Sequence, residues 1–262
     1  MDLTLLFIGL AVLVDGIAGL AGGLLSERWM ARHLSELVAF AAGALLGAVF
    51  LDLLPHAVAT AGPSAFPWAF TSFLALALFS WLLGPHHHDH STHAPGHPHH
   101  PEHLSDSQRV VPSLLAADAL HNLGDGAALA AAFLVSPEAG VATTVAIIAH
   151  ELPQEVGDYA LLRAAGLSRG RSLAALAGVQ LTAAVGAGAV LLGSRFMAGL
   201  EGIILALASG TFLYIGATDL LPDVRRGGTP RETRGRMLGF LLGVALVAGV
   251  GFLEETLLLP HP

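Results

Sequence analysis

Runs of apolar residues, each close to twenty residues long, recur along the whole chain. About twenty apolar residues in an α-helix span the hydrocarbon core of a bilayer. Of the 262 residues, 54% are hydrophobic and only 12% are charged, whereas an ordinary soluble domain has about 25% charged residues. The sequence therefore predicts an integral membrane protein made of α-helices, with little left over for a soluble domain.

The apolar runs predict an all-α membrane protein with eight transmembrane helices. The expected spans are 3–25, 34–54, 66–84, 110–134, 139–163, 172–194, 201–221 and 237–259. They divide the chain into four expected units, which are helices 1–3 in 1–84, a His-rich loop in 85–109, helices 4 and 5 in 110–163, and helices 6–8 in 164–262.

Basic residues are distributed unevenly between the loops that join these spans. All twelve are Arg, and eleven of them lie on alternate loops, while only Arg195 lies on the other side. Loops rich in Arg and Lys stay in the cytoplasm, so both termini are expected outside it. The use of Arg in place of Lys, with abundant Ala, Gly and Leu, favours a bacterial source and hence the inner (cytoplasmic) membrane.

The chain also contains an internal repeat. The stretches 43-GALLGAVFLDLLPH-56 and 210-GTFLYIGATDLLPD-223 share the frame G-x8-D-L-L-P, at an offset of 167 residues. The second span is expected to run outward and the seventh inward, as the halves of an inverted repeat do. We therefore expect three spans, a central antiparallel pair and three more spans (3+2+3), although Gly-rich apolar helices also resemble one another by chance.

Polar residues form a stripe in each of the two central spans. Within each span they are three, four or seven residues apart, which places them on one helical face. Ionisable groups at membrane depth cost about 2.5–3.5 kcal/mol each on insertion scales, so the two stripes are expected to face each other or a water-filled path. The residues are Asp118, His121, Asn122 and Asp125 in the first stripe, and His150, Glu151, Gln154, Glu155 and Asp158 in the second.

Imidazole, carboxylate and amide groups at spacings of one helical turn are suitable ligands for a divalent transition metal. The chain has no Cys, so the ligands must be N and O atoms, which favours Zn²⁺, Mn²⁺, Fe²⁺ or Co²⁺ over Cu⁺. Pro153 removes a backbone N–H within the second stripe, and we expect it to interrupt the helix and expose polar backbone to a cavity. A polar network that only joins two helices is the alternative.

Other polar residues within or beside apolar spans have less specific expected roles. Asp15 and Gln180 are expected to pack or to support the site. A further set lies beside the prolines at the ends of the second and seventh spans, where it either passes ions into and out of the membrane or simply lies at the interface. This set is Asp52, His56, Asp219 and Asp223.

The stretch 86-HHHDHSTHAPGHPHHPEH-103 has nine His among 18 residues, with Pro and Gly that disfavour regular structure. It predicts a cytoplasmic tether that binds metal weakly, and the alternative is a linker whose His content has no use. The first of these His residues are His86, His87, His88 and His90.

The sequences HNLGDG at 121–126 and HELPQEVGDYALL at 150–162 resemble the signature helices of the ZIP (zinc- and iron-regulated transporter-like) family, and most closely its members that read HNFxDG and HExPHExGD. The stretches around D-L-L-P and the His-rich loop are similar to this family too, so the resemblance covers nearly the whole chain. It implies an eight-helix fold with inverted symmetry. It also implies divalent-metal uptake, most often of zinc, toward the cytoplasm by an elevator-like movement.

By position, the resemblance assigns His121, Asp125 and His150 to a first metal site. It assigns Asn122 and Glu151 to a second metal site, with residue 154 close to both. Position 154 is Gln, where the motif has His or, in other bacterial members, Glu. A neutral amide binds a divalent ion more weakly, so the resemblance leaves open whether one or two ions are bound. It also leaves open whether the ion is Zn²⁺, Mn²⁺, Fe²⁺, Co²⁺ or Cd²⁺.

These observations together predict a divalent-metal transporter that is not an enzyme and uses no organic cofactor. Its expected partners are the metal ion as substrate and membrane lipid, without nucleic acid, and a homodimer is left open. An intramembrane zinc hydrolase is the alternative, because HELPQ is similar to H-E-x-x-H; Gln154 in place of the second His and the expected break at Pro153 argue against it. A metal sensor without flux leaves the buried stripes unexplained.

Overall fold

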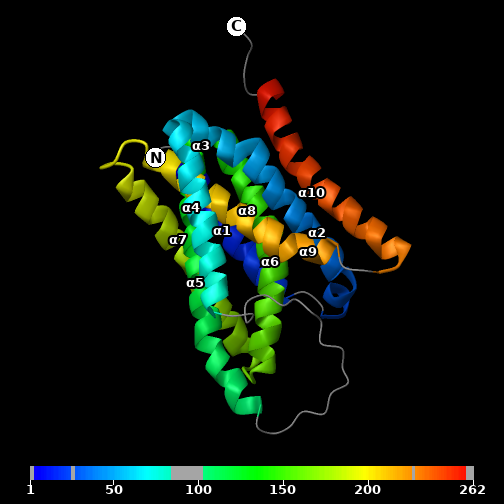
Figure 1. The fold of residues 1–262 in the computed structure, drawn as a ribbon. Helices are drawn as coiled ribbons and strands as arrows, with labels where there is room; N and C mark the ends of the chain where they lie inside the picture. Colours follow the sequence, from blue (N-terminus) through cyan, green and yellow to red (C-terminus); the bar gives the residue numbers. More distant parts are fainter. Residues whose placement is uncertain (1–2, 25–26, 84–102, 226–227, 258–262) are drawn as a thin grey trace.

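The computed structural model describes residues 3–24, 27–83, 103–225 and 228–257, which form a bundle of long helices (Figure 1). These residues contain no strand, which confirms the all-α prediction for this part of the chain. The predicted metal-binding residues His86, His87, His88 and His90 lie outside the described residues. The α-helices are α1 (Leu3–Leu24), α2 (Glu27–Ala48), α3 (Leu54–Ala61), α4 (Ala65–Leu83), α5 (His103–Val135), α6 (Pro137–Ala164), α7 (Arg169–Gly193), α8 (Leu200–Tyr214), α9 (Leu221–Val224) and α10 (Pro230–Leu257).

Five stretches of the described residues are long and apolar enough to cross a membrane. One of them is 49 residues long and contains the second predicted span and most of the third. Helices α5 and α6 coincide with the fourth and fifth predicted spans, but the polar residues in their middles lower their hydropathy. That the chain crosses the membrane eight times therefore stays a prediction. The five stretches are Leu3–Ala21, His33–Trp81, Arg169–Gly193, Leu200–Leu220 and Pro230–Phe252.

Two π-helical segments lie at matching positions of the internal repeat. The first, η1 (Val49–Leu53), joins α2 to α3, and the second, η3 (Ile215–Leu220), joins α8 to α9. Each ends two residues before a proline, Pro55 or Pro222. A proline ring clashes with the carbonyl four residues earlier in an α-helix, and the wider π turn moves that carbonyl away. The shared D-L-L-P sequence thus gives the same local distortion twice.

Two helices begin earlier than the apolar runs predict, and one expected break is absent. Helix α2 begins at Glu27 and α5 at His103, seven residues before each expected span, because polar residues continue a helix beyond the apolar part. The expectation that Pro153 interrupts its helix is wrong, since α6 continues through it. The fixed φ of proline is close to the helical value, so the chain can continue as a helix although the hydrogen bond to the Ala149 carbonyl is given up.

Small residues allow the helices to pack closely. Helix α7 lies along α5, and α10 lies along α2 (Figure 1). A Cβ atom on Gly126 of α5 would clash with the Ala183 carbonyl of α7, and one on Gly186 of α7 would clash with the Leu123 carbonyl of α5. The two glycines thus bring the backbones together, as small residues do between membrane helices.

The variant Gly126→Ala is therefore expected to destabilise the protein by about 1–3 kcal/mol, as overpacking of a close contact does. Gly124 is the matched control, because a Cβ atom there meets nothing within 4 Å. Gly124→Ala is expected to be neutral or to stabilise by up to about 1 kcal/mol, because Ala is the better helix former. Thermal unfolding of both purified variants in detergent measures the difference. Equal midpoints for the two variants would contradict this account of the α5–α7 contact.

Candidate metal site

Helices α5 and α6 follow each other directly and run antiparallel. The turn between them is short because Ser136 caps α6, accepting a hydrogen bond from the Ala139 N–H at 3.0 Å, and Pro137 starts the first turn. This arrangement is the usual one for a helix N-terminus. The two polar stripes predicted from the sequence therefore lie on neighbouring helices.

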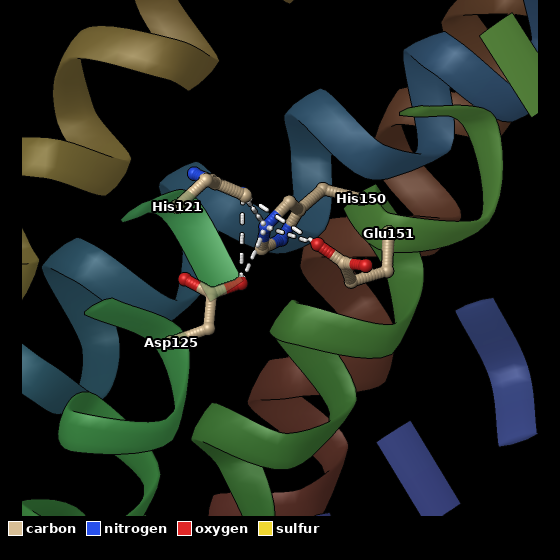
Figure 2. Close-up of side chains that lie close together, drawn as sticks. All are labelled: His121, Asp125, His150 and Glu151. Atoms are coloured by element: carbon tan, nitrogen blue, oxygen red, sulfur yellow. Dashed lines mark hydrogen bonds and ion pairs between the residues drawn. The ribbon is translucent and has the colours of Figure 1, made fainter. Parts of the chain in front are cut away.

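Four side chains from these two helices converge on one point, as Figure 2 shows. His121 and Asp125 come from α5, and His150 and Glu151 come from α6. One ligand atom from each lies within 4.8 Å of all the others. Three of the residues are at most 3% exposed, and the His121 side chain is 15% exposed. We call these four residues the histidine cluster.

The separations within the histidine cluster suit a single metal ion. His150 Nε2 lies 3.1 Å from His121 Nε2 and 3.1 Å from Asp125 Oδ2. Glu151 Oε1 lies 3.6 Å from His121 Nε2 and 4.0 Å from His150 Nε2. Ligand atoms around a tetrahedral zinc ion, each about 2.0–2.2 Å from the metal, are roughly 3.3 Å apart. The four atoms thus need to move little to bind one ion.

The hydrogen bonds of His150 leave its second nitrogen free to bind. Its Nδ1 lies 3.0 Å from the Ala146 carbonyl oxygen, which can only accept, so Nδ1 carries the proton. In a neutral ring Nε2 is then an acceptor. It faces Asp125 Oδ2, which also accepts, and this arrangement requires a cation or a proton between them.

Three further predicted ligands lie one turn away from the histidine cluster. Asn122 donates to Asp118 Oδ1 at 3.1 Å, and Gln154 donates to the same oxygen at 3.2 Å. The amide nitrogens of both therefore point at Asp118. Glu151, which the resemblance assigns to a second metal, lies instead with the two histidines of the first.

Gln180 of α7 binds two carboxylates of α6. Its Nε2 donates to Glu151 Oε2 at 3.0 Å and to Glu155 Oε1 at 2.6 Å. Glu155 is fully buried here, so it lies on the α7 side of α6 and outside the histidine cluster. Glu151 Oε1 has no hydrogen bond and faces the histidines. The sequence predicted only a packing or supporting role for Gln180, because a lone Gln in an apolar span gives no periodic signal.

Asp15 of α1 is fully buried, and neither of its carboxylate oxygens has a hydrogen-bond partner among the residues that the structure describes. It is close enough to Asp125 and His150 to interact electrostatically with both. A third helix thus adds a carboxyl group to the surroundings of the histidine cluster. In its ionised form this group favours a bound cation there.

A cavity of about 450 Å³ adjoins the histidine cluster. It is lined by residues of α4, α5 and α6, and of α8 and the π-helical segment η3 that follows it. No Arg side chain lines it within the part of the chain that the structure describes. The polar residues along its wall include Asp118, His121, Asp125, His150, Gln154, Asp158 and Asp219.

The residues predicted to pass ions in and out lie in different places. Asp219, in η3, lines the cavity. Asp52, in η1, and His56, in α3, are paired, with His56 Nδ1 3.2 Å from Asp52 Oδ1, and they lie outside the cavity wall. Asp223 belongs to α9, and its side chain lies outside the described residues.

The apolar helices of the bundle, and the group of metal-ligand atoms that they enclose, are typical of an integral membrane protein that binds a metal ion. The sequence pattern of the family described as ZIP zinc transporter matches residues 82–251. The zinc transporter ZIP13 of Pongo abelii is 31% identical over 249 residues, which cover 86% of this chain and 69% of that protein. The chain therefore belongs to the ZIP zinc transporter family.

Other relatives are longer than this chain. The zinc transporter ZIP4 of Homo sapiens is 40% identical over 147 residues, covering 56% of this chain and 22% of that protein. The zinc transporter SLC39A7 of Rattus norvegicus is 35% identical over 149 residues, covering 53% of this chain and 31% of that protein. The chain thus matches less than a third of either. The relatives are transporters and not enzymes, so the hydrolase alternative is not favoured.

Proposed function

We propose that this protein carries a divalent transition-metal ion, most often Zn²⁺, across the membrane toward the cytoplasm through the histidine cluster. The observation that carries the proposal is the convergence of four buried or half-buried ligand atoms from His121, Asp125, His150 and Glu151 within 4.8 Å. Two imidazoles and two carboxylates are borderline ligands that suit zinc, and they also accept Mn²⁺, Fe²⁺, Co²⁺ and Cd²⁺. The metal is the substrate, and the proposal includes no organic cofactor.

The proposal places a single ion in the histidine cluster. Glu151 Oε1 belongs to the same group of atoms as the two imidazoles. The Asn122 amide nitrogen is directed at Asp118, and the neutral Gln154 adds no charge. These contacts favour one ion over the two that the resemblance leaves open.

We also propose that eight spans cross the bilayer, with both termini outside the cytoplasm, and that the two outer groups of three are inverted repeats. The matched π segments, η1 and η3, support the repeat. The excess of Arg on alternate loops supports the orientation of the termini. The direction of transport, toward the cytoplasm, rests on the resemblance to the family, and the composition rich in Arg, Ala, Gly and Leu favours a bacterial inner membrane. In inverted-repeat transporters, one group of helices moves against the other around the substrate site, and an elevator-like movement fits this plan.

The division of the chain follows from this plan. Residues 1–84 and 164–262 are the two helix groups, 110–163 carries the metal site, and 85–109 is a cytoplasmic tether whose His residues bind metal weakly. Helix α5 already begins at His103, so the last part of the tether is helical. Membrane lipid surrounds the bundle, and a homodimer is compatible with it.

Metal flux into proteoliposomes tests the proposed function. The full-length protein is reconstituted with a fluorescent metal indicator inside, and Zn²⁺, Mn²⁺, Fe²⁺, Co²⁺ and Cd²⁺ are added outside. We expect flux above that of protein-free vesicles, with Zn²⁺ first among the ions. Absence of flux for every ion, by a protein that elutes as a folded species, would overturn the proposal.

A further inference from the structure

Two aspartates line the cavity beside the histidine cluster but do not belong to it. Asp118 lies three residues before His121 on α5, and Asp158 lies eight residues after His150 on α6. Because the two helices are antiparallel, both aspartates lie on the same side of the histidine cluster. They are displaced toward the end of the bundle where α5 begins and α6 ends.

Both aspartates have a buried oxygen without a partner. Each residue is 4% exposed, and Oδ2 of each makes no hydrogen bond to any described residue. The other oxygen of Asp118 accepts from the two amides of Asn122 and Gln154. The two carboxylates also repel each other electrostatically. Burying ionised carboxylates together in this way is unfavourable unless a cation offsets their charge.

Gln154 contacts one of the two aspartates and lies one helical turn before the other. Its amide contacts Asp118 at 3.2 Å, and Asp158 is four residues further along α6, on the same helical face. Rotation of the Gln154 amide by half a turn presents its oxygen in place of its nitrogen. Three oxygen atoms, one from each residue, are then available on the cavity wall.

We propose that Asp118, Gln154 and Asp158 form a second cation position, separate from the histidine cluster, that holds a divalent ion next to it along the cavity. This inference rests on the proposed function, in which an ion passes along that cavity. Arg163 lies in the last turn of α6, at the end of the bundle assigned to the cytoplasm. The second position therefore lies between the histidine cluster and the side of release.

The chemistry of the second position differs from that of the histidine cluster. Its ligands are all oxygen atoms, and oxygen ligands suit Mn²⁺ better than imidazole-rich sites do. Zinc is therefore held less tightly there than between His121 and His150. A weaker position beside a tighter one allows the ion to leave the histidine cluster in two small steps.

Titration of Mn²⁺ by electron paramagnetic resonance, on the purified full-length protein in detergent, tests the second position. The background variant is His150→Ala, which disables the histidine cluster. We expect it still to bind Mn²⁺, and we expect the further change Asp158→Asn to weaken that binding by about tenfold or more. Loss of a residue that only hydrogen-bonds to a metal ligand already lowers metal affinity by about 10–100-fold, so loss of a ligand is expected to lower it at least as much. The His-rich loop is the same in all variants and cancels from the comparison.

Glu138→Gln, in the first turn of α6 and away from the cavity wall, is the matched control and is expected to leave Mn²⁺ binding unchanged. Elution volume and thermal midpoint show that each variant is folded. Equal Mn²⁺ binding with and without Asp158→Asn, or no binding by His150→Ala, would overturn the second position. That outcome leaves the proposed function standing if zinc flux still depends on His150. Conversely, if the protein shows no zinc flux but binds Mn²⁺ in a way that depends on Asp158, the proposed transport function is overturned and the second position stands.

Discussion

The variant His150→Ala is expected to reduce zinc flux in proteoliposomes by about 100-fold or more, because even the partners of metal ligands are worth about 10–100-fold in affinity. His150 Nε2 makes the two shortest contacts of the histidine cluster, 3.1 Å to His121 and 3.1 Å to Asp125. Its removal also leaves two buried carboxylates with one imidazole between them. The measurement is the initial rate of indicator fluorescence at several zinc concentrations.

The fold of His150→Ala is expected to survive, because the residue borders the cavity and water can occupy the space of the lost ring. The matched control is His33→Ala, which removes an exposed His on α2 and is expected to keep flux within twofold or so of the wild type. Wild-type flux by a folded His150→Ala protein would remove the histidine cluster from the transport path. Equal losses in both variants would mean that the flux assay reports on protein quality.

Much of the fold could be predicted from the apolar runs, because each span needs about twenty apolar residues whatever its neighbours are. The beginnings of α2 and α5 could not, since a helix continues into water without an apolar signal. The sequence also could not predict that the helices are distorted before Pro55 and Pro222 but continue regularly through Pro153. All three prolines lie in helices, yet a π turn precedes only the first two.

The part of the candidate site that follows from helical periodicity within α5 and α6 could be predicted from the sequence. A spacing of four residues places His121 with Asp125 and His150 with Gln154 on single faces, and the short turn at Ser136 makes α5 and α6 neighbours. Periodicity cannot tell which residues of a polar stripe face a third helix. Glu151 and Gln154 are both buried or half-buried, but one meets Gln180 and the other meets Asp118. That choice depends on how α7 packs.

Gly19 controls the position of Gln180, and Gly19→Ala is expected to weaken zinc binding by about 10–100-fold without touching a ligand. A Cβ atom on Gly19 would overlap Gln180 Nε2 and lie 2.8 Å from its Cδ. These atoms are the flexible end of the side chain, so Gln180 can turn away without a shift of the backbone. It then loses its hydrogen bonds to Glu151 and Glu155, and Glu151 is no longer held with one oxygen toward the histidines.

Gly16→Ala is the matched control, because its Cβ atom would lie 3.9 Å from Gln180 Cβ, an ordinary contact that leaves the amide in place. Isothermal titration with Zn²⁺ and thermal unfolding of Gly19→Ala, Gly16→Ala and Gln180→Ala separate the effects. We expect Gly19→Ala and Gln180→Ala to lose affinity alike and to unfold at similarly lowered midpoints, because both lose two buried hydrogen bonds, while Gly16→Ala unfolds near the wild-type midpoint. If Gly19→Ala binds zinc as the wild type does while Gln180→Ala does not, the affinity depends on Gln180 through something other than its hydrogen bonds to Glu151 and Glu155. If both bind normally, Glu151 needs no orientation from α7, and the ligand positions are determined by α5 and α6 alone.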